Sequence, residues 1–252
     1  MARVRSLVFS VLLTTIGGAL AAQMPIVGAS RLLHFDPTRV TPGQFVYSTV
    51  LEHDITGTAL GTRVVTTTST TYNGASSWLL VESKTGGSVS SLDTLFIDQA
   101  GLRPQHWGST IGRARLGIEF RNDSAFGGTT APAGRHSVFS ALPPATMINA
   151  AMLETVLRTL PLNAAWEDST TTLSVSLGSV TPLPTRIAVI GEDNVRVPAG
   201  QFDCWVVSVR AADLTRGMYW VTKQNPMIVR SALDVPTLNG AQYVSSLTTV
   251  LR

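Results

Sequence analysis

The sequence predicts a mainly β protein built on a large curved antiparallel sheet, or open half-barrel, with one covering helix near residues 144–160. Short segments of alternating apolar and polar residues recur through most of the chain, and turn signals such as Asn73-Gly74 separate them. No helical pattern stands between these segments before residue 134, so a doubly wound parallel sheet is excluded. A sheet of about ten or more strands is expected to curl, because open twisted sheets of that size seldom stay flat.

The expected strands share a two-residue period, in which successive side chains point to opposite faces of the sheet. Before the helix they are expected at residues 45–53, 62–72, 76–84, 92–97 and within 102–126. After the helix they are expected at residues 171–177, 186–190, 195–198, 202–209, 217–222, 227–235 and 241–251.

Residues 195–210 form the strongest predicted strand pair. Ala199-Gly200 supplies a bend, and residues 202–209 that follow are strongly apolar on both faces. Such a pattern is typical of a central strand rather than a half-exposed one. Cys204 lies within it and is the only cysteine, so an intramolecular disulfide is excluded. It is expected to be a small buried residue and not a reactive thiol.

The helix is predicted from an apolar stripe that begins after Pro143-Pro144 and ends before Pro161. The stripe is wider than one helix face, so the helix is expected to be covered by the concave side of the sheet. Its two charges, Glu154 and Arg158, have the spacing of a favourable helical ion pair worth a few tenths of a kcal/mol.

The first residues predict a cleaved secretory signal peptide. A positively charged start precedes the apolar residues 7–16, and Ala19-Leu20-Ala21 supplies a small-x-small cleavage pattern. The apolar run is shorter than the ~20 residues of a membrane span. We therefore expect residues 1–21 to be removed and residues 22–252 to form a single β-rich domain. The mature protein is expected to be periplasmic or secreted and not to span a membrane.

Several functional classes lack their sequence signals. The formal net charge is +3, but the arginines are scattered singly, so the clustered basic surface of a nucleic-acid-binding protein is missing. The four histidines are far apart and no metal-ligand spacing occurs, so neither a metal nor another cofactor is predicted. The hydrolase elbow and the phosphate-binding loops are also missing. The dense titratable cluster Glu52-His53-Asp54 is expected to be a solvated strand end, since neighbouring side chains of a strand diverge.

The C-terminal strands carry a resemblance to a known family. Residues 191–205, G-E-D-N-V-R-V-P-A-G-Q-F-D-C-W, are followed by M-Y-W-V-T-K at 218–223 and M-I-V-R at 227–230. This pattern resembles a family of uncharacterised exported bacterial β-rich proteins, and residues 94–104 resemble its upstream hairpin. The resemblance extends from about Leu92 onward and implies structure, with no catalytic residue to transfer. The expected architecture is also distantly similar to periplasmic lipoprotein-carrier proteins, which hold acyl chains between sheet and helix.

Together these observations favour a non-enzymatic exported envelope protein that binds a lipid or another apolar ligand between sheet and helix. The candidate ligand contacts are Ile148, Met152 and Val156 of the helix and Trp220 of a later strand, although a filled core is the preferred interpretation of the tryptophans themselves. The alternatives are an exported hydrolase with a dispersed active site and a purely structural interaction domain. A histidine brought together with a carboxylate and a serine would favour the hydrolase. The sequence assigns neither a ligand, a partner protein nor an oligomeric state.

Overall fold

The computed structural model describes residues 34–86, 90–121, 123–132, 134–141, 146–148, 151–176, 179–212, 216–235, 237–238 and 240–251. The predicted signal peptide lies outside these residues. Fifteen strands form one sheet. In chain order the strands are β1 (Gly43–His53), β2 (Thr56–Tyr72), β3 (Ala75–Thr85), β4 (Ser91–Asp98), β5 (Pro104–Ile111), β6 (Ala114–Arg121), β7 (Ser124–Ala131), β8 (Gly134–Ala141), β9 (Thr146–Ile148), β10 (Glu167–Ser176), β11 (Ser179–Val197), β12 (Gly200–Ala211), β13 (Arg216–Thr222), β14 (Ile228–Asp234) and β15 (Gln242–Leu251). The helices of the described residues are the short 3-10 helix η1 (Pro37–Arg39) and the α-helix α1 (Ala151–Leu157).

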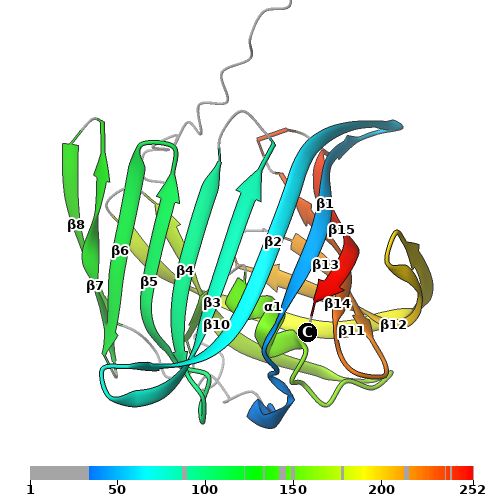
Figure 1. The fold of residues 1–252 in the computed structure, drawn as a ribbon, viewed down its shortest axis with the longest axis horizontal. Coiled ribbons are helices and arrows are strands. Elements are labelled where there is room, and N and C mark those ends of the chain that lie inside the picture. The colour runs from blue at the N-terminus through cyan, green and yellow to red at the C-terminus, as the bar shows by residue number, and fades with distance from the viewer. Residues whose placement is uncertain are drawn as a thin grey trace, which may run out of the picture.

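The order of the strands in the sheet consists of two series, each of which contains strands that are consecutive in the chain. Strands β1 to β8 lie side by side in sequence order, and β15 back to β9 continue the sheet on the other side of β1. Pairing of β1 with β15 therefore joins the first and last strands of the fold. All neighbours are antiparallel except β9, which pairs with β10 in parallel. The predicted mainly β class, with one large antiparallel sheet and a short helix, is confirmed (Figure 1).

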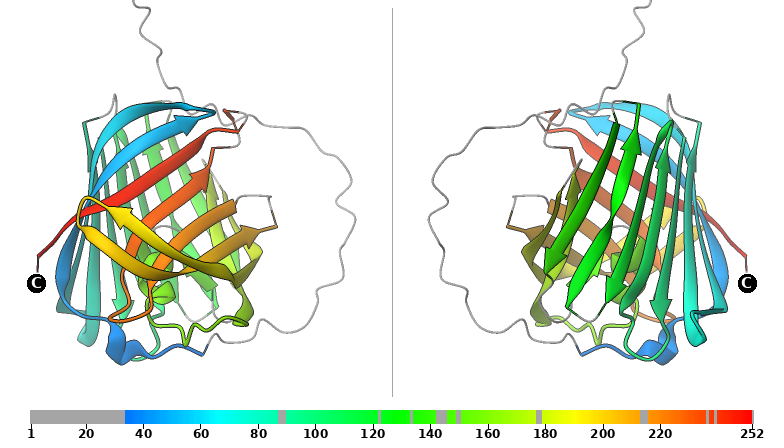
Figure 2. Two further views of the ribbon diagram at one scale, coloured as in Figure 1. Left: turned by 90° about the vertical axis from the view of Figure 1, so that its right-hand side faces the viewer. Right: turned by 90° about the vertical axis from the view of Figure 1, so that its left-hand side faces the viewer.

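The sheet curls round on itself, as expected for its width. Its edge strand β8 returns into contact with β11, and the two views of Figure 2 show strands on opposite sides of the molecule facing each other. The helix α1 contacts β3 from within this curl. Strands of the sheet can therefore pack against more than one side of the helix.

The predicted helix over residues 144–160 is too long at both ends. Residues Thr146–Ile148 are the strand β9, whose backbone pairs with Thr171 to Leu173 of β10. Pairing with a neighbouring strand satisfies the backbone groups that a longer helix would have satisfied internally. At the other end the helix tightens, because the Thr159 amide donates to the carbonyl of Val156, three residues back.

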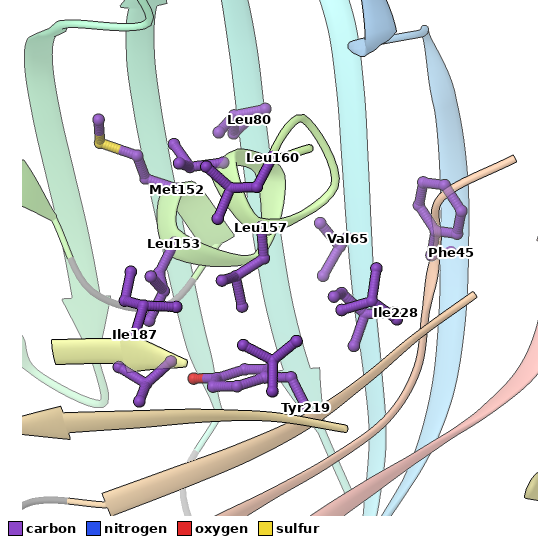
Figure 3. Close-up of a cluster of buried hydrophobic side chains, with 14 of the residues drawn as sticks. Phe45, Val65, Leu80, Met152, Leu153, Leu157, Leu160, Ile187, Tyr219 and Ile228 are labelled. Carbon is purple, nitrogen blue, oxygen red and sulfur yellow. The ribbon is translucent and has the colours of Figure 1, made fainter. Parts of the chain in front are cut away.

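The core fills the inside of the curl and encloses α1. Every residue from 152 to 160 is buried, including the charged and hydroxyl-bearing ones. Figure 3 shows Leu153 and Leu157 pointing toward Ile187 and Tyr219 from the opposite strands. The expectation that so apolar a helix is covered is confirmed.

The predicted strand pair at residues 195–210 is confirmed as the β11–β12 hairpin, and β12 is a central strand between β11 and β13. Gly200 opens β12 with φ of +140°. The Cys204 side chain is fully buried, and burial, with Asp193 and Asp203 nearby, raises the pKa of its thiol to about 12. An inert buried thiol is therefore what the structure contains.

Candidate ligand-binding site

A cluster of buried charges lies where α1 meets β2 and β3. The Arg63 guanidinium of β2 binds both carboxylate oxygens of Glu154 in α1, with Nη1–Oε1 at 2.9 Å and Nη2–Oε2 at 2.8 Å. Its Nη2 also donates to Glu82 of β3 at 2.9 Å. The other oxygen of Glu82 lies 2.6 Å from the ammonium group of Lys84, whose side chain is partly exposed. Arg63, Glu82 and Glu154 are each less than a tenth exposed.

Mutual pairing keeps these groups charged in spite of their burial. Burial disfavours the charge of Arg63, but Glu154 and Glu82 outweigh it and hold its pKa well above the ordinary value. Burial would likewise raise the pKa of Glu82, but Arg63 and Lys84 outweigh it and lower this pKa to about 2. The helix is thus fixed to the sheet by an ion pair with two parallel hydrogen bonds, the strongest arrangement for such a pair.

Arg158 is a further buried cation, and it lacks a partner of this kind. The predicted ion pair between Glu154 and Arg158 does not form, because Arg63 occupies both oxygens of Glu154. No carboxylate of the described residues lies within 4.0 Å of the Arg158 guanidinium. Its hydrogen bond is a long one, from Nη2 to the Thr155 hydroxyl at 3.4 Å, and its guanidinium carbon lies 4.9 Å from the centre of the Phe45 ring.

The side chain of Arg158 lines a pocket of about 290 Å³. The pocket lies between the segment that enters β1, the end of α1 and the connection from β13 to β14. Its lining is Arg39, Thr41, Pro42, Phe45, Arg158, Asn225, Pro226 and Met227. Phe45 and Arg158 are themselves buried, so the pocket reaches from the surface to the core. It combines apolar walls with two guanidinium groups.

The structure brings only some of the predicted contact residues together. Met152 and Val156 lie in the core and are each 1% exposed. Ile148 belongs to β9 at the edge of the sheet. Trp220 follows Tyr219, whose side chain faces α1 (Figure 3), so alternation places Trp220 on the other face of β13. There its indole nitrogen donates to Asp193 at 2.9 Å. Contact of these residues with a ligand stays a prediction.

Sequence reasoning missed the charge cluster, although signals for it were present. Glu82 lies two residues after the apolar Leu80 and therefore shares its face of the strand, and Glu154 and Arg158 stand in an otherwise apolar helix. Charged residues on an apolar face predict buried pairs, since an unpaired buried charge is costly. Arg63 could not be linked to Glu154, because 91 residues separate them in the chain.

A second polar cluster lies on β5 and β6. The Nδ1 atom of His106 lies 2.7 Å from Glu119 Oε1, and the Tyr72 hydroxyl donates to Glu119 at 3.2 Å. Beside it is a pocket of about 560 Å³ whose lining includes Tyr72 and Glu119. No serine of the described residues has a hydrogen bond with His106. In the predicted solvated cluster, His53 and Asp54 do approach to 3.6 Å, because Asp54 sits in a turn with φ of +53°.

Among the described residues, no group of three or more histidine, cysteine, aspartate or glutamate side chains is placed to hold a metal ion. None of the helices in this part of the chain has the length and apolar character needed to cross a membrane.

Comparison with known proteins identifies a sequence family and a similar fold. A family model described as "Protein of unknown function (DUF3108)" matches residues 47–241, which begins well before the expected limit near Leu92. No curated protein matches the chain in sequence. The fold is similar to that of a β-barrel-like protein of the domain of unknown function DUF1849 from Brucella abortus, with a TM-score of 0.55 and 11% identity over 84% of this chain and 98% of that chain.

A weaker similarity involves a protein from Bacteroides fragilis that is inferred to be exported and has a YmcC-like fold. Its TM-score is 0.31, with 11% identity over 84% of this chain and 97% of that chain. At that score the similarity supports no conclusion about this chain.

Proposed function

This chain belongs to the DUF3108 family of proteins of unknown function, and we propose that it is an exported, non-enzymatic envelope protein that binds a lipid or another apolar ligand inside the curled sheet. The observation that carries the proposal is the pocket between β1 and the end of α1. Its walls include Phe45 and Met227, and it ends on buried residues. Mostly apolar pockets with a few convergent polar groups are typical of small-molecule sites.

The size of the pocket limits the ligand that it can hold without a shift of the surrounding elements. A volume of about 290 Å³ is at the lower end of the range for ligand pockets. An alkyl chain of ten carbons or so therefore contacts Phe45 and Met227 first. It reaches the predicted contacts Met152 and Val156 only if α1 or its neighbours shift, because both side chains are packed on all sides.

Two tryptophan substitutions test this proposal. Met227→Trp should fill the pocket, reduce binding of a fluorescent fatty-acid probe and leave the thermal midpoint nearly unchanged, since Met227 is only half-buried. Met152→Trp should instead overpack the core and destabilise the fold by roughly 1–3 kcal/mol. Probe titration and thermal unfolding on both variants separate a pocket effect from a general loss of structure.

The proposal is overturned if the wild-type protein binds no probe and carries no lipid. The second point is measured by native mass spectrometry on protein extracted from its native envelope.

Export is tested separately by sequencing the N-terminus after expression in a bacterial host. The proposal expects the mature chain to begin at Ala22 or within a residue or two of it. An intact Met1 in the membrane fraction would contradict the cleaved signal.

Hydrolysis is a second candidate function, favoured by the pair of His106 and Glu119. A carboxylate bound to one ring nitrogen orients a histidine for general-base chemistry at the other. This alternative expects slow turnover of a p-nitrophenyl ester that His106→Ala abolishes. The matched control is His53→Ala, because His53 also lies near a carboxylate but is about half exposed. Equal rates in both variants would eliminate the alternative.

A further inference from the structure

The geometry points to a binding site for an anionic group, a carboxylate or a phosphate, on the Arg158 guanidinium at the floor of the pocket beside α1. This inference deepens the proposed function by stating the charge of the ligand, and it rests on that function only for the ligand's apolar part. Three observations support an anion-binding site at Arg158: the charge balance around it, its geometry and the lining of the pocket.

The charge cluster beside α1 holds one more cation than carboxylates when the partly exposed Lys84 is counted. Its members are the cations Arg63, Lys84 and Arg158 and the carboxylates Glu82 and Glu154. Both oxygens of Glu154 are bound by Arg63, and those of Glu82 are bound by Arg63 and Lys84. Arg158 is therefore the cation for which no carboxylate of the described residues remains. A buried charge without a partner is costly, and an anionic ligand would supply that partner.

The position of Arg158 suits such a ligand. The residue is only 7% exposed, yet it lines the pocket. The Phe45 ring lies 4.9 Å from its guanidinium carbon, a cation–π contact that fixes the group without using its N–H donors. Of these five donors, one is bound, and only at 3.4 Å to Thr155. The remaining donors can serve a carboxylate or a phosphate oxygen.

A second guanidinium lies at the mouth of the same pocket. Arg39 is half-exposed, pairs with Asp36 at 3.4 Å and donates to the carbonyl of Leu160 at 3.4 Å. It is thereby held against the segment that follows Arg158. Two guanidinium groups and apolar walls together favour an amphipathic anion, with its charged end at Arg158 and its apolar part against Phe45 and Met227.

The test compares decanoate with its neutral counterpart decanol by titration calorimetry, and includes inorganic phosphate as a free anion. Wild-type protein should bind decanoate at least about tenfold more tightly than decanol, as expected for hydrogen bonds to a charged group. Arg158→Met should remove this preference, so that decanoate and decanol bind with similar affinity. The control Arg186→Met, at an exposed arginine paired with Glu167, should retain the full preference.

Arg39→Gln provides a second variant that does not depend on a core substitution. It should weaken decanoate binding by a smaller factor than Arg158→Met and leave decanol binding and the thermal midpoint unchanged. If Arg158→Met fails to fold, an unchanged preference for decanoate over decanol in Arg39→Gln overturns the inference.

The outcomes distinguish this inference from the proposed function. Equal affinity of the wild type for decanoate and decanol, or a preference that survives in Arg158→Met, overturns the anion site and leaves apolar binding intact. Phosphate binding that depends on Arg158, without any binding of decanoate or decanol, supports the anion site and overturns the proposed apolar ligand. If none of the three compounds binds, both proposals fail.

Discussion

Arg63 of β2 and Glu154 of α1 are joined by two parallel hydrogen bonds of 2.9 and 2.8 Å inside the curled sheet. The two residues lie 91 positions apart in the chain, and their contact fixes the helix against the sheet. Because Arg63 also binds Glu82, one guanidinium connects β2, β3 and α1. The remaining buried cation, Arg158, is left facing a pocket. The same pairing therefore accounts for the position of the helix and for the candidate site.

Replacing Arg63 by methionine is expected to destabilise the protein strongly. The change leaves Glu154 without its partner and Glu82 with Lys84 alone, both in a buried setting. Breaking a buried ion pair from one side costs about 3–5 kcal/mol, which denaturant unfolding would measure. The double variant Arg63→Met/Glu154→Met should cost less than the sum of the single changes, because no unpaired carboxylate is left at position 154.

The matched control for this experiment is Arg186→Met. Arg186 binds Glu167 through two short hydrogen bonds on the surface, where solvent screens the pair, so little change in stability is expected. Equal losses of unfolding free energy in the Arg63 and Arg186 variants would show that burial does not govern how much the charge cluster contributes to stability.

Stability is expected to fall in acid because of Glu82. Its pKa is held at about 2 in the folded protein, against an ordinary value of 4.5. A carboxylate whose pKa is lowered by folding stabilises the native state above the unfolded pKa, and this contribution is lost as pH falls from 4.5 toward 2. Unfolding midpoints of the wild type should therefore drop steeply in this window. The Glu82→Gln variant should be less stable at neutral pH and should lose less stability on acidification. Parallel curves for the two proteins would contradict the assignment.

Gly200 should resist replacement for a reason of backbone conformation. Its φ of +140° is one that side-chain-bearing residues rarely adopt, whereas an added Cβ would meet the Phe202 ring at an ordinary 3.5 Å. Gly200→Val is therefore expected to cost roughly 1–3 kcal/mol through strain alone. Gly191→Val is the control, because a Cβ at Gly191 meets open space and no such φ is required. Thermal midpoints that match wild type in both variants would make the β11–β12 turn an ordinary one.

The parts of the fold that the sequence predicts are those that depend on patterns of neighbouring residues. The two-residue period of the strands, the Asn73-Gly74 turn and the hairpin around Gly200 are properties of neighbouring residues, so they can be recognised without the structure. Positive φ at both Asn73 and Gly74 agrees with the predicted hairpin turn. The bounds of the helix do not follow from local pattern, because residues 146–148 suit either a buried helix or a strand, and only pairing with β10 decides between them.

The candidate site depends on contacts that no local pattern contains. A mainly β chain, a covered apolar helix and a buried Cys204 can be predicted from the sequence, since each follows from residue type and spacing within one segment. The pairing of Glu154 with Arg63 instead of Arg158 depends on the tertiary structure, and so does the position of Trp220 on the face of β13 away from the helix. The physical reason is that an ion pair forms where the curl of the sheet brings two charges together. That curl is set by the pairing of all fifteen strands and not by any one of them.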